Sequence, residues 1–168
     1  TTHRMHSAEL LRQIIDEVRP QLEALGEKAA AHKSSPDSWS PKEVLGHLID
    51  SAVNNHLRFV RAVRQDNLVF EGYDQDHWVS IQQYQERRWT DLISFWHQYN
   101  VHLAHVMRAI PDEVRDRIHT KHNLHKIAMR AVPTYSPISL AYLMRDYVWH
   151  LEHHLAQILP GYARKLHW

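Results

Sequence analysis

Histidine is the residue type in this sequence with the most potential for chemistry, because its imidazole binds metals and transfers protons near neutral pH. The chain carries 16 histidines in 168 residues. Chance alone therefore produces histidine pairs at helical spacing, and several pairs lie three positions apart. Only His150 and His154 lie four positions apart. Spacing by itself does not identify a metal site. We therefore ask which face of its predicted helix or loop each histidine occupies.

His150 and His154 fall on the stripe of a helix that is expected to face the protein interior. The stripe continues through Leu143, Tyr147, Leu151, Leu155 and Ile158. Two inward imidazoles one helical turn apart have Cβ atoms about 5–6 Å apart, a separation that suits chelation of a single ion. A hydrogen-bonded pair or a small internal water cluster is the structural alternative. His153, with Asp146 and Trp149, is expected nearer the opposite side.

His47 lies on a different helical segment, along a polar stripe with Ser51, Asn54 and Arg58. A lone histidine on a helix is more often structural than a ligand, so a functional role for His47 requires partners from another helix. Asp50 follows at the third position. We expect it either to orient His47 or to serve as a base, and a solvated helix charge is the alternative for Asp50.

The other histidine clusters are less promising. His119, His122 and His125 fall beside lysines in a segment without apolar periodicity, and we expect a surface segment there. His102 and His105 share one face of a helix, where exposed or hydrogen-bonded roles are expected. Neither group therefore predicts a metal site.

Several familiar sites are absent from the sequence. The chain has no cysteine, which excludes disulfides, thiolate metal ligands and a cysteine nucleophile. It contains no Glu-x-x-His pattern, as di-iron bundles have, and no His-Glu-x-x-His pattern, as zinc proteases have. A glycine-rich phosphate loop is missing as well. Any thiol chemistry must therefore use a thiol supplied by a small molecule.

Four amphipathic helical segments are expected to position the histidines. The first starts near Ser7, a plausible N-cap, ends near Gly26, and is kinked or split by Pro20. The second starts at Ser40, where Pro41 and Glu43 complete the pattern of a capping box, and runs to about residue 64. Its inward residues are expected to include Val44, Leu45, Leu48, Ile49, Ala52, Val53 and Val60. Gly46 within it predicts a close approach of another helix.

The second half of the chain predicts two more long helices. A helical stretch near residues 80–88 leads into the third long helix. Thr90 is expected to cap the start of this helix, and Pro111 is expected to end it. Residues 112–135 predict a long irregular connection. The fourth helix starts at Ser136 or Ser139 and ends at residues 160–161. We therefore predict an all-α fold, a four-helix bundle, in a single domain spanning residues 1–168.

Charge and composition limit the partners. The formal net charge is +1, with 20 basic and 19 acidic residues. No strong field for nucleic acid or an anionic membrane is expected from this balance. No apolar run approaches a membrane span, and residues 1–6 lack the apolar core of a signal peptide. A cytoplasmic location is the expectation.

Two segments together resemble the DinB/YfiT-like family of metal-binding proteins. They are residues 39–51 (WSPKEVLGHLIDS) and residues 146–158 (DYVWHLEHHLAQI). The resemblance implies a four-helix bundle of DinB/YfiT type, commonly a homodimer. By position it implies His47, His150 and His154 as ligands of one divalent ion. Zinc or nickel is the first expectation for that ion, and iron or manganese is the alternative.

The resemblance also implies an activity. Family members with an assigned activity are thiol S-transferases or isomerases that use low-molecular-weight thiols such as bacillithiol or mycothiol. A small-molecule thiol and an electrophilic substrate are therefore the expected partners. Hydrolysis by metal-activated water, with Asp50 as base, is the second hypothesis. A non-catalytic bundle that binds metal or mediates dimerisation is the third.

Overall fold

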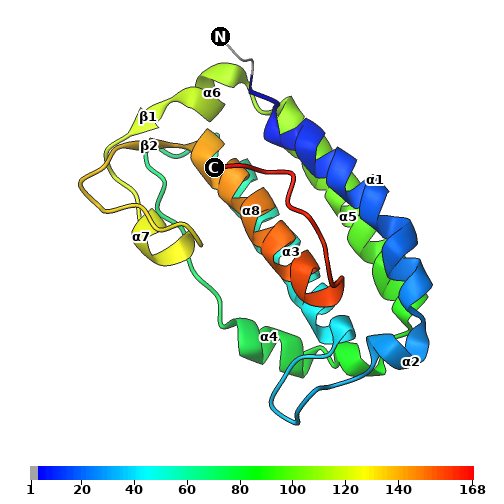
Figure 1. Cartoon of the computed structure of the whole chain (residues 1–168). Coiled ribbons are helices and arrows are strands. Elements are labelled where there is room, and N and C mark those ends of the chain that lie inside the picture. Colours follow the sequence, from blue (N-terminus) through cyan, green and yellow to red (C-terminus); the bar gives the residue numbers. More distant parts are fainter. Residues whose placement is uncertain (1–3) are drawn as a thin grey trace.

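Four long helices form the body of the protein in this computed structural model, which describes residues 4–168. They are α1 (Ser7–Leu25), α3 (Pro41–Ala62), α5 (Trp89–Ala109) and α8 (Leu140–Ile158). Helix α1 packs along α5, and α3 packs against both α5 and α8 (Figure 1). The predicted four-helix bundle is confirmed. No helix in this part of the chain has the length and apolarity needed to cross a bilayer.

Short elements connect the long helices. Helix α2 (Glu27–Ala30) follows α1, and α4 (Gln75–Ile81) with the 3₁₀ turn η1 (Tyr84–Glu86) precedes α5. Helices α6 (Asp112–Asp116) and α7 (Leu124–Ile127) lie between α5 and α8. Two short antiparallel strands, β1 (Ile118–His119) and β2 (Ile138–Ser139), pair in the register Ile118↔Ser139 and His119↔Ile138. The predicted irregular connection thus contains local structure.

Helix α1 differs from the prediction at its start, and of the two effects expected at Pro20 a split is absent. His6, not Ser7, is the N-cap, because its Nδ1 accepts a hydrogen bond of 3.0 Å from the backbone N–H of Ala8. The helix is not split at Pro20, since α1 runs without a break to Leu25. Gly26 ends it with a φ of 79°, a left-handed conformation that glycine adopts at little cost.

Helix α3 begins with the predicted capping box. The Ser40 hydroxyl accepts from the backbone N–H of Glu43, and the Glu43 carboxylate accepts from the backbone N–H of Ser40. Val60 is 52% exposed, so its predicted inward position is wrong, and Phe59 packs into the core instead. Gly46 does face a close neighbour, but that neighbour is the ring of Tyr84 in η1, which a Cβ at position 46 would overlap.

The two later helices start without the expected side-chain caps. Helix α5 begins at Trp89, one residue before Thr90, and its N-cap residue Arg88 makes no side-chain cap bond. Of the two starts predicted for the fourth helix, Ser136 and Ser139, the structure has Ser139 as the N-cap of α8. The Ser139 hydroxyl makes no hydrogen bond to the first turn of the helix. Because β2 leads directly into α8, that strand fixes the direction from which the chain enters the helix.

The histidines of the connection were expected on the surface, and two of them are buried. His119 and His122 are each less than one-tenth exposed, whereas His125 is exposed. His122 bonds through Nε2 to the carbonyl of Ser136 at 2.8 Å, and its Nδ1 accepts from the backbone N–H of Leu124 at 3.1 Å. Nδ1 of His119 lies 3.3 Å from the carbonyl of Asp66, in the segment after α3. Periodicity could not reveal these backbone contacts.

Candidate metal centre

Three histidines from two helices converge at one point between α3 and α8. His47 is fully buried on α3, while His150 and His154 are partly buried on α8. The Nε2 atoms of His47 and His150 are 3.1 Å apart. Each ring offers one nitrogen, and the three nitrogens all lie within 4.8 Å of one another. Within residues 4–168, these are the only three histidine or carboxylate side chains that meet in this way.

Nδ1 of each of the two α8 histidines has a side-chain partner, one on α8 and one on α3. Nδ1 of His154 lies 2.9 Å from the side-chain oxygen of Gln157, and Nδ1 of His150 lies 3.5 Å from the Ser51 hydroxyl. An N–H at Nδ1 leaves Nε2 of the same ring with its lone pair. The contact with Gln157 therefore holds His154 in the tautomer in which Nε2 can act as a ligand.

Burial keeps the three imidazoles neutral. Loss of solvent, with a smaller contribution from His154, lowers the pKa of His47 to about 3. Burial also holds the pKa of His150 well below its usual value and lowers the pKa of His154. The neutral ring is the form that donates a lone pair to a metal, so protons do not compete for these nitrogens near pH 7.

The arrangement fits a divalent ion. Zn–N bonds of about 2.0–2.1 Å in a tetrahedron place neighbouring nitrogens about 3.3 Å apart. The 3.1 Å between Nε2 of His47 and Nε2 of His150 is close to that value. Two neutral rings can share at most one proton along this contact, whereas an ion between them would accept both lone pairs. Three imidazoles around one ion also leave a coordination position for another molecule.

Asp50 does not join the three histidines. Its Oδ1 accepts hydrogen bonds from the Tyr84 hydroxyl at 2.6 Å and from Nε2 of Gln82 at 2.8 Å. Burial raises the pKa of Asp50, against these two bonds, which lower it. Its Oδ2 is buried without a hydrogen-bond partner, and so is Nδ1 of His47 one helical turn earlier on α3. An unpaired acceptor and an unpaired ring nitrogen thus lie one turn apart beside the centre.

Trp39 closes one side of the centre. Its ring centroid lies 5.0 Å from that of His47, with the two planes inclined at 38°. Trp39 directly precedes the Ser40 cap of α3, so the capping box that starts the helix also fixes the loop that carries this indole. The indole replaces water against the His47 ring, which accounts in part for the lowered pKa of His47.

A cavity of about 410 Å³ opens beside the histidines of α8. His150, His153 and His154 line one wall of it. His153 was expected nearer the opposite side of α8, and that prediction is wrong: its ring centroid lies 5.0 Å from that of His154. The remaining wall is formed by Arg58, Gly72, Tyr73, Gln75, Lys126, Ile127, Ala128 and Met129.

Asp146 holds part of this wall in place. Its carboxylate is buried and accepts backbone N–H bonds from Met129 at 2.9 Å and from Arg130 at 2.8 Å. Asp146 was expected, with Trp149, nearer the side of α8 opposite the apolar stripe. Its carboxylate is buried and ties the segment after α7 to α8. The cavity wall is therefore attached to the helix that carries two of the three histidines.

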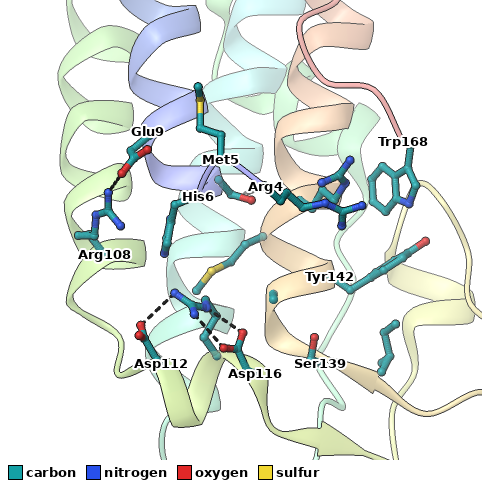
Figure 2. Close-up of a pocket in the computed structure, with 16 residues that line it drawn as sticks. Arg4, Met5, His6, Glu9, Arg108, Asp112, Asp116, Ser139, Tyr142 and Trp168 are labelled. Atoms are coloured by element: carbon teal, nitrogen blue, oxygen red, sulfur yellow. Dashed lines mark hydrogen bonds and ion pairs between the residues drawn. The ribbon is translucent and has the colours of Figure 1, made fainter. Parts of the chain in front are cut away.

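A second cavity, of about 570 Å³, lies where the N-terminal segment meets α6 and the start of α8. Figure 2 shows its ion pairs: Arg108 with Glu9, and Arg115 with Asp112 and Asp116. None of the three converging histidines lines it. This cavity is larger, but it contains none of the nitrogen atoms that could bind a metal in the centre. Two of the three converging histidines, His150 and His154, line the smaller cavity.

The sequence profile of the DinB superfamily matches residues 10–158, most of the chain and both histidine-bearing helices. The chain belongs to the DinB superfamily. Among solved structures, YfiT from Bacillus subtilis has a similar fold, with a TM-score of 0.69 and 19% sequence identity. The match covers 94% of this chain and 87% of YfiT, which is described as "a probable metal-dependent hydrolase with an unusual four-helix bundle topology". At that identity the match supports the fold.

Other relatives of this chain carry similar names. A protein of Oceanobacillus iheyensis named "Putative metal-dependent hydrolase" is 27% identical over 127 residues, which cover 76% of this chain and 67% of that protein. A protein of Halalkalibacterium halodurans with the same type of name is 25% identical over 143 residues, which cover 76% of this chain and 68% of the relative. The relatives are thus named as metal-dependent, and this DinB-superfamily member has a three-histidine cluster suited to a metal.

Proposed function

We propose that this protein is a metal-dependent thiol S-transferase in which His47, His150 and His154 hold the ion. The observation that carries the proposal is the convergence of three neutral imidazoles beside a cavity lined by cationic and neutral groups. We expect zinc or nickel, with iron or manganese as alternatives, because imidazole suits all of them. A bound ion would supply Lewis acidity, which lowers the pKa of a coordinated thiol.

The protein's own residues favour a thiolate in this cavity. The thiol has to come from a small molecule, because the chain has no cysteine. In the transfer, the thiolate sulfur forms a bond to an electrophilic carbon, the carbon–leaving-group bond breaks, and the thiol proton goes to solvent. Arg58 and Lys126 in the cavity wall give the cavity a positive potential that favours an anionic thiol.

Hydrolysis is the second candidate, and the names of the relatives favour it. It requires a base for the attacking water, and Asp50 was the expected base. Asp50 does not line the cavity beside the histidines of α8, and its Oδ1 already accepts hydrogen bonds from Tyr84 and Gln82, which make it a weaker base. Thiol transfer requires no carboxylate base in the cavity, because a bound ion would lower the pKa of the thiol enough for its proton to pass to water. The thiol reaction therefore suits this site better.

Conjugation of a thiol to monochlorobimane tests the proposal, since the carbon–sulfur bond that forms releases chloride and yields a fluorescent product. We expect the zinc- or nickel-loaded protein to accelerate conjugation above the uncatalysed rate, and His150→Ala to remove the acceleration. Turnover of ester or amide substrates without any thiol would support the hydrolase instead. Full metal occupancy with neither activity would support the non-catalytic metal-binding bundle.

We also propose that the protein is a homodimer. Support comes from large apolar side chains exposed on two adjacent helices, Leu57 and Val60 on α3 and Phe95 on α5. Exposed apolar groups of this size often lie at interfaces between subunits. Light scattering coupled to size-exclusion chromatography tests the state, and a monomer at micromolar concentration would contradict it.

A further inference from the structure

Arg58 occupies an unusual position in the wall of the cavity beside the metal centre. Its side chain is only 6% exposed, although it carries a full positive charge. Nη2 donates a 3.0 Å hydrogen bond to the carbonyl of Glu71, and Nη1 makes a long contact of 3.5 Å with the side-chain oxygen of Asn55. The guanidinium lies 5.9 Å from the centroid of the Tyr73 ring. These contacts fix the group and leave most of its five N–H donors free.

No carboxylate neutralises Arg58 at contact distance. Within residues 4–168, no acidic oxygen lies within 4.0 Å of its nitrogens. Asp146 attracts it from farther away, but both carboxylate oxygens of Asp146 accept backbone N–H bonds from the segment after α7. Burying a charge without a counter-ion is costly. A guanidinium held in this way is ready for an anion that enters the cavity.

The cavity joins Arg58 to the metal ligands. Arg58, Tyr73 and Lys126 line it together with His150 and His154. Arg58 follows His47 by eleven positions on α3, about three helical turns, so both side chains leave the helix on nearly the same face. At about 1.5 Å per residue, their Cα atoms are about 16 Å apart. The cavity can thus accept a molecule that reaches both the ion and the guanidinium.

We infer that Arg58, assisted by Lys126, binds the carboxylate of the thiol cosubstrate while its sulfur faces His150 and His154. This inference rests on the proposed function, because it identifies the class of thiol that the transferase uses. A planar guanidinium matches a carboxylate through two parallel N–H···O bonds, a geometry that a lysine ammonium does not provide. Arg58 is then the specificity-determining residue of the site, and the cosubstrate is a small carboxylate-bearing thiol.

Two thiols of equal chain length test the inference by binding alone. Isothermal titration calorimetry of the zinc-loaded protein compares 3-mercaptopropionate with 3-mercaptopropan-1-ol, which carries a hydroxyl in place of the carboxylate. We expect the carboxylate to bind about 10-fold or more tightly than the alcohol, as charge-assisted hydrogen bonds in a buried site allow. Equal affinities in the wild-type protein would overturn the inference.

Variants of Arg58 then assign the preference. Arg58→Met should bind the two thiols equally. Arg58→Lys should keep only part of the preference for the carboxylate, because lysine retains the positive charge but lacks the two parallel N–H donors of the guanidinium. Arg61→Met is the matched control, since Arg61 is exposed on the same helix, and it should keep the full preference. An unchanged preference in Arg58→Met would contradict the assignment. Circular dichroism and zinc content establish that each variant is folded and loaded, and the wild-type comparison decides even if Arg58→Met does not fold.

Failure of this inference differs from failure of the proposed function. Conjugation of monochlorobimane by both thiols, with no preference for the carboxylate, would leave the transferase standing and remove the role of Arg58. Preferential binding of 3-mercaptopropionate without any conjugation would retain the carboxylate site and remove the transferase.

Discussion

The Nε2 atoms of His47 and His150 lie 3.1 Å apart, although 103 positions separate the two residues in the chain. Packing of α3 against α8 creates this approach, and the single turn between His150 and His154 adds the third ring. Both nitrogens belong to rings that burial keeps neutral. The histidines therefore direct nitrogen lone pairs, and not protonated ring nitrogens, toward one point, as binding of a metal ion requires.

Loss of one ligand should remove the ion. His150→Ala leaves two imidazoles, and we expect the purified untagged variant to contain less than about one-tenth of the wild-type metal, since each ligand contributes several kcal/mol to a site of this type. Inductively coupled plasma mass spectrometry measures the content. His105→Ala, which removes an exposed histidine from α5, should retain one equivalent. Equal metal in both variants would refute the assignment of the centre.

The metal-free protein should lose stability as the pH falls below 6.5. The unfolded chain protonates His47 near its usual pKa of 6.5, whereas in the folded protein this pKa is lowered to about 3. The unfolded state therefore binds more protons between pH 6.5 and 3, and stability present above pH 6.5 declines through this window. His47 alone should contribute a loss of about 2 kcal/mol at pH 5.

Urea unfolding of the chelator-treated protein at pH 8, 6.5 and 5 measures this effect. His47→Gln is the matched variant, because it keeps a polar side chain that does not titrate. The wild-type protein should lose more stability between pH 8 and pH 5 than the variant does. Parallel pH dependences in the two proteins would show that His47 is not the buried neutral group.

Gly46 should be intolerant of a methyl group because the Tyr84 ring occupies the space where a Cβ would lie. Alanine normally gains about 1 kcal/mol over glycine inside a helix. Overpacking of a buried site costs about 1–3 kcal/mol. We expect Gly46→Ala to be destabilising overall in urea unfolding, and also to disturb the bond from the Tyr84 hydroxyl to Asp50.

A double-mutant cycle separates the steric clash from other effects. In a Tyr84→Ala background, Gly46→Ala should be neutral or stabilising, because the ring that it meets is gone. Gly72→Ala serves as a positional control, since no atom lies within 4 Å of a Cβ built there. A loss of stability from Gly46→Ala that persists without the Tyr84 ring would contradict the steric explanation.

Asp146 should govern the order of the cavity wall. Its carboxylate accepts the backbone N–H groups of Met129 and Arg130, so Asp146→Ala leaves both without a partner at a cost of about 1–3 kcal/mol. Hydrogen exchange followed by mass spectrometry should show faster exchange confined to residues near 128–132. Asp91→Ala, at an exposed position of α5, should leave exchange there unchanged. Unaltered exchange in Asp146→Ala would show that the wall does not depend on this carboxylate.

Local patterns in the sequence determined the helices and part of the site. The box formed by Ser40 and Glu43 is a short-range motif, and it starts α3 where the sequence predicts. Likewise, the apolar stripe that contains His150 and His154 predicts which side of α8 faces the bundle. The polar stripe of α3 already included His47 and Arg58. These features depend on residues within a few turns of one another, so periodicity and capping rules suffice to find them.

Only the tertiary structure decided what those stripes face. In the folded protein Arg58 is buried beside the histidines of α8, and His153 lines the same cavity. Asp146 accepts a backbone N–H bond from the segment after α7. His119 and His122 are also buried, His119 beside the carbonyl of Asp66 in the segment after α3 and His122 beside the carbonyl of Ser136. The physical reason is that burial and counter-charge depend on segments far apart in the chain, and a helical period carries no information about which partner will cover a given face.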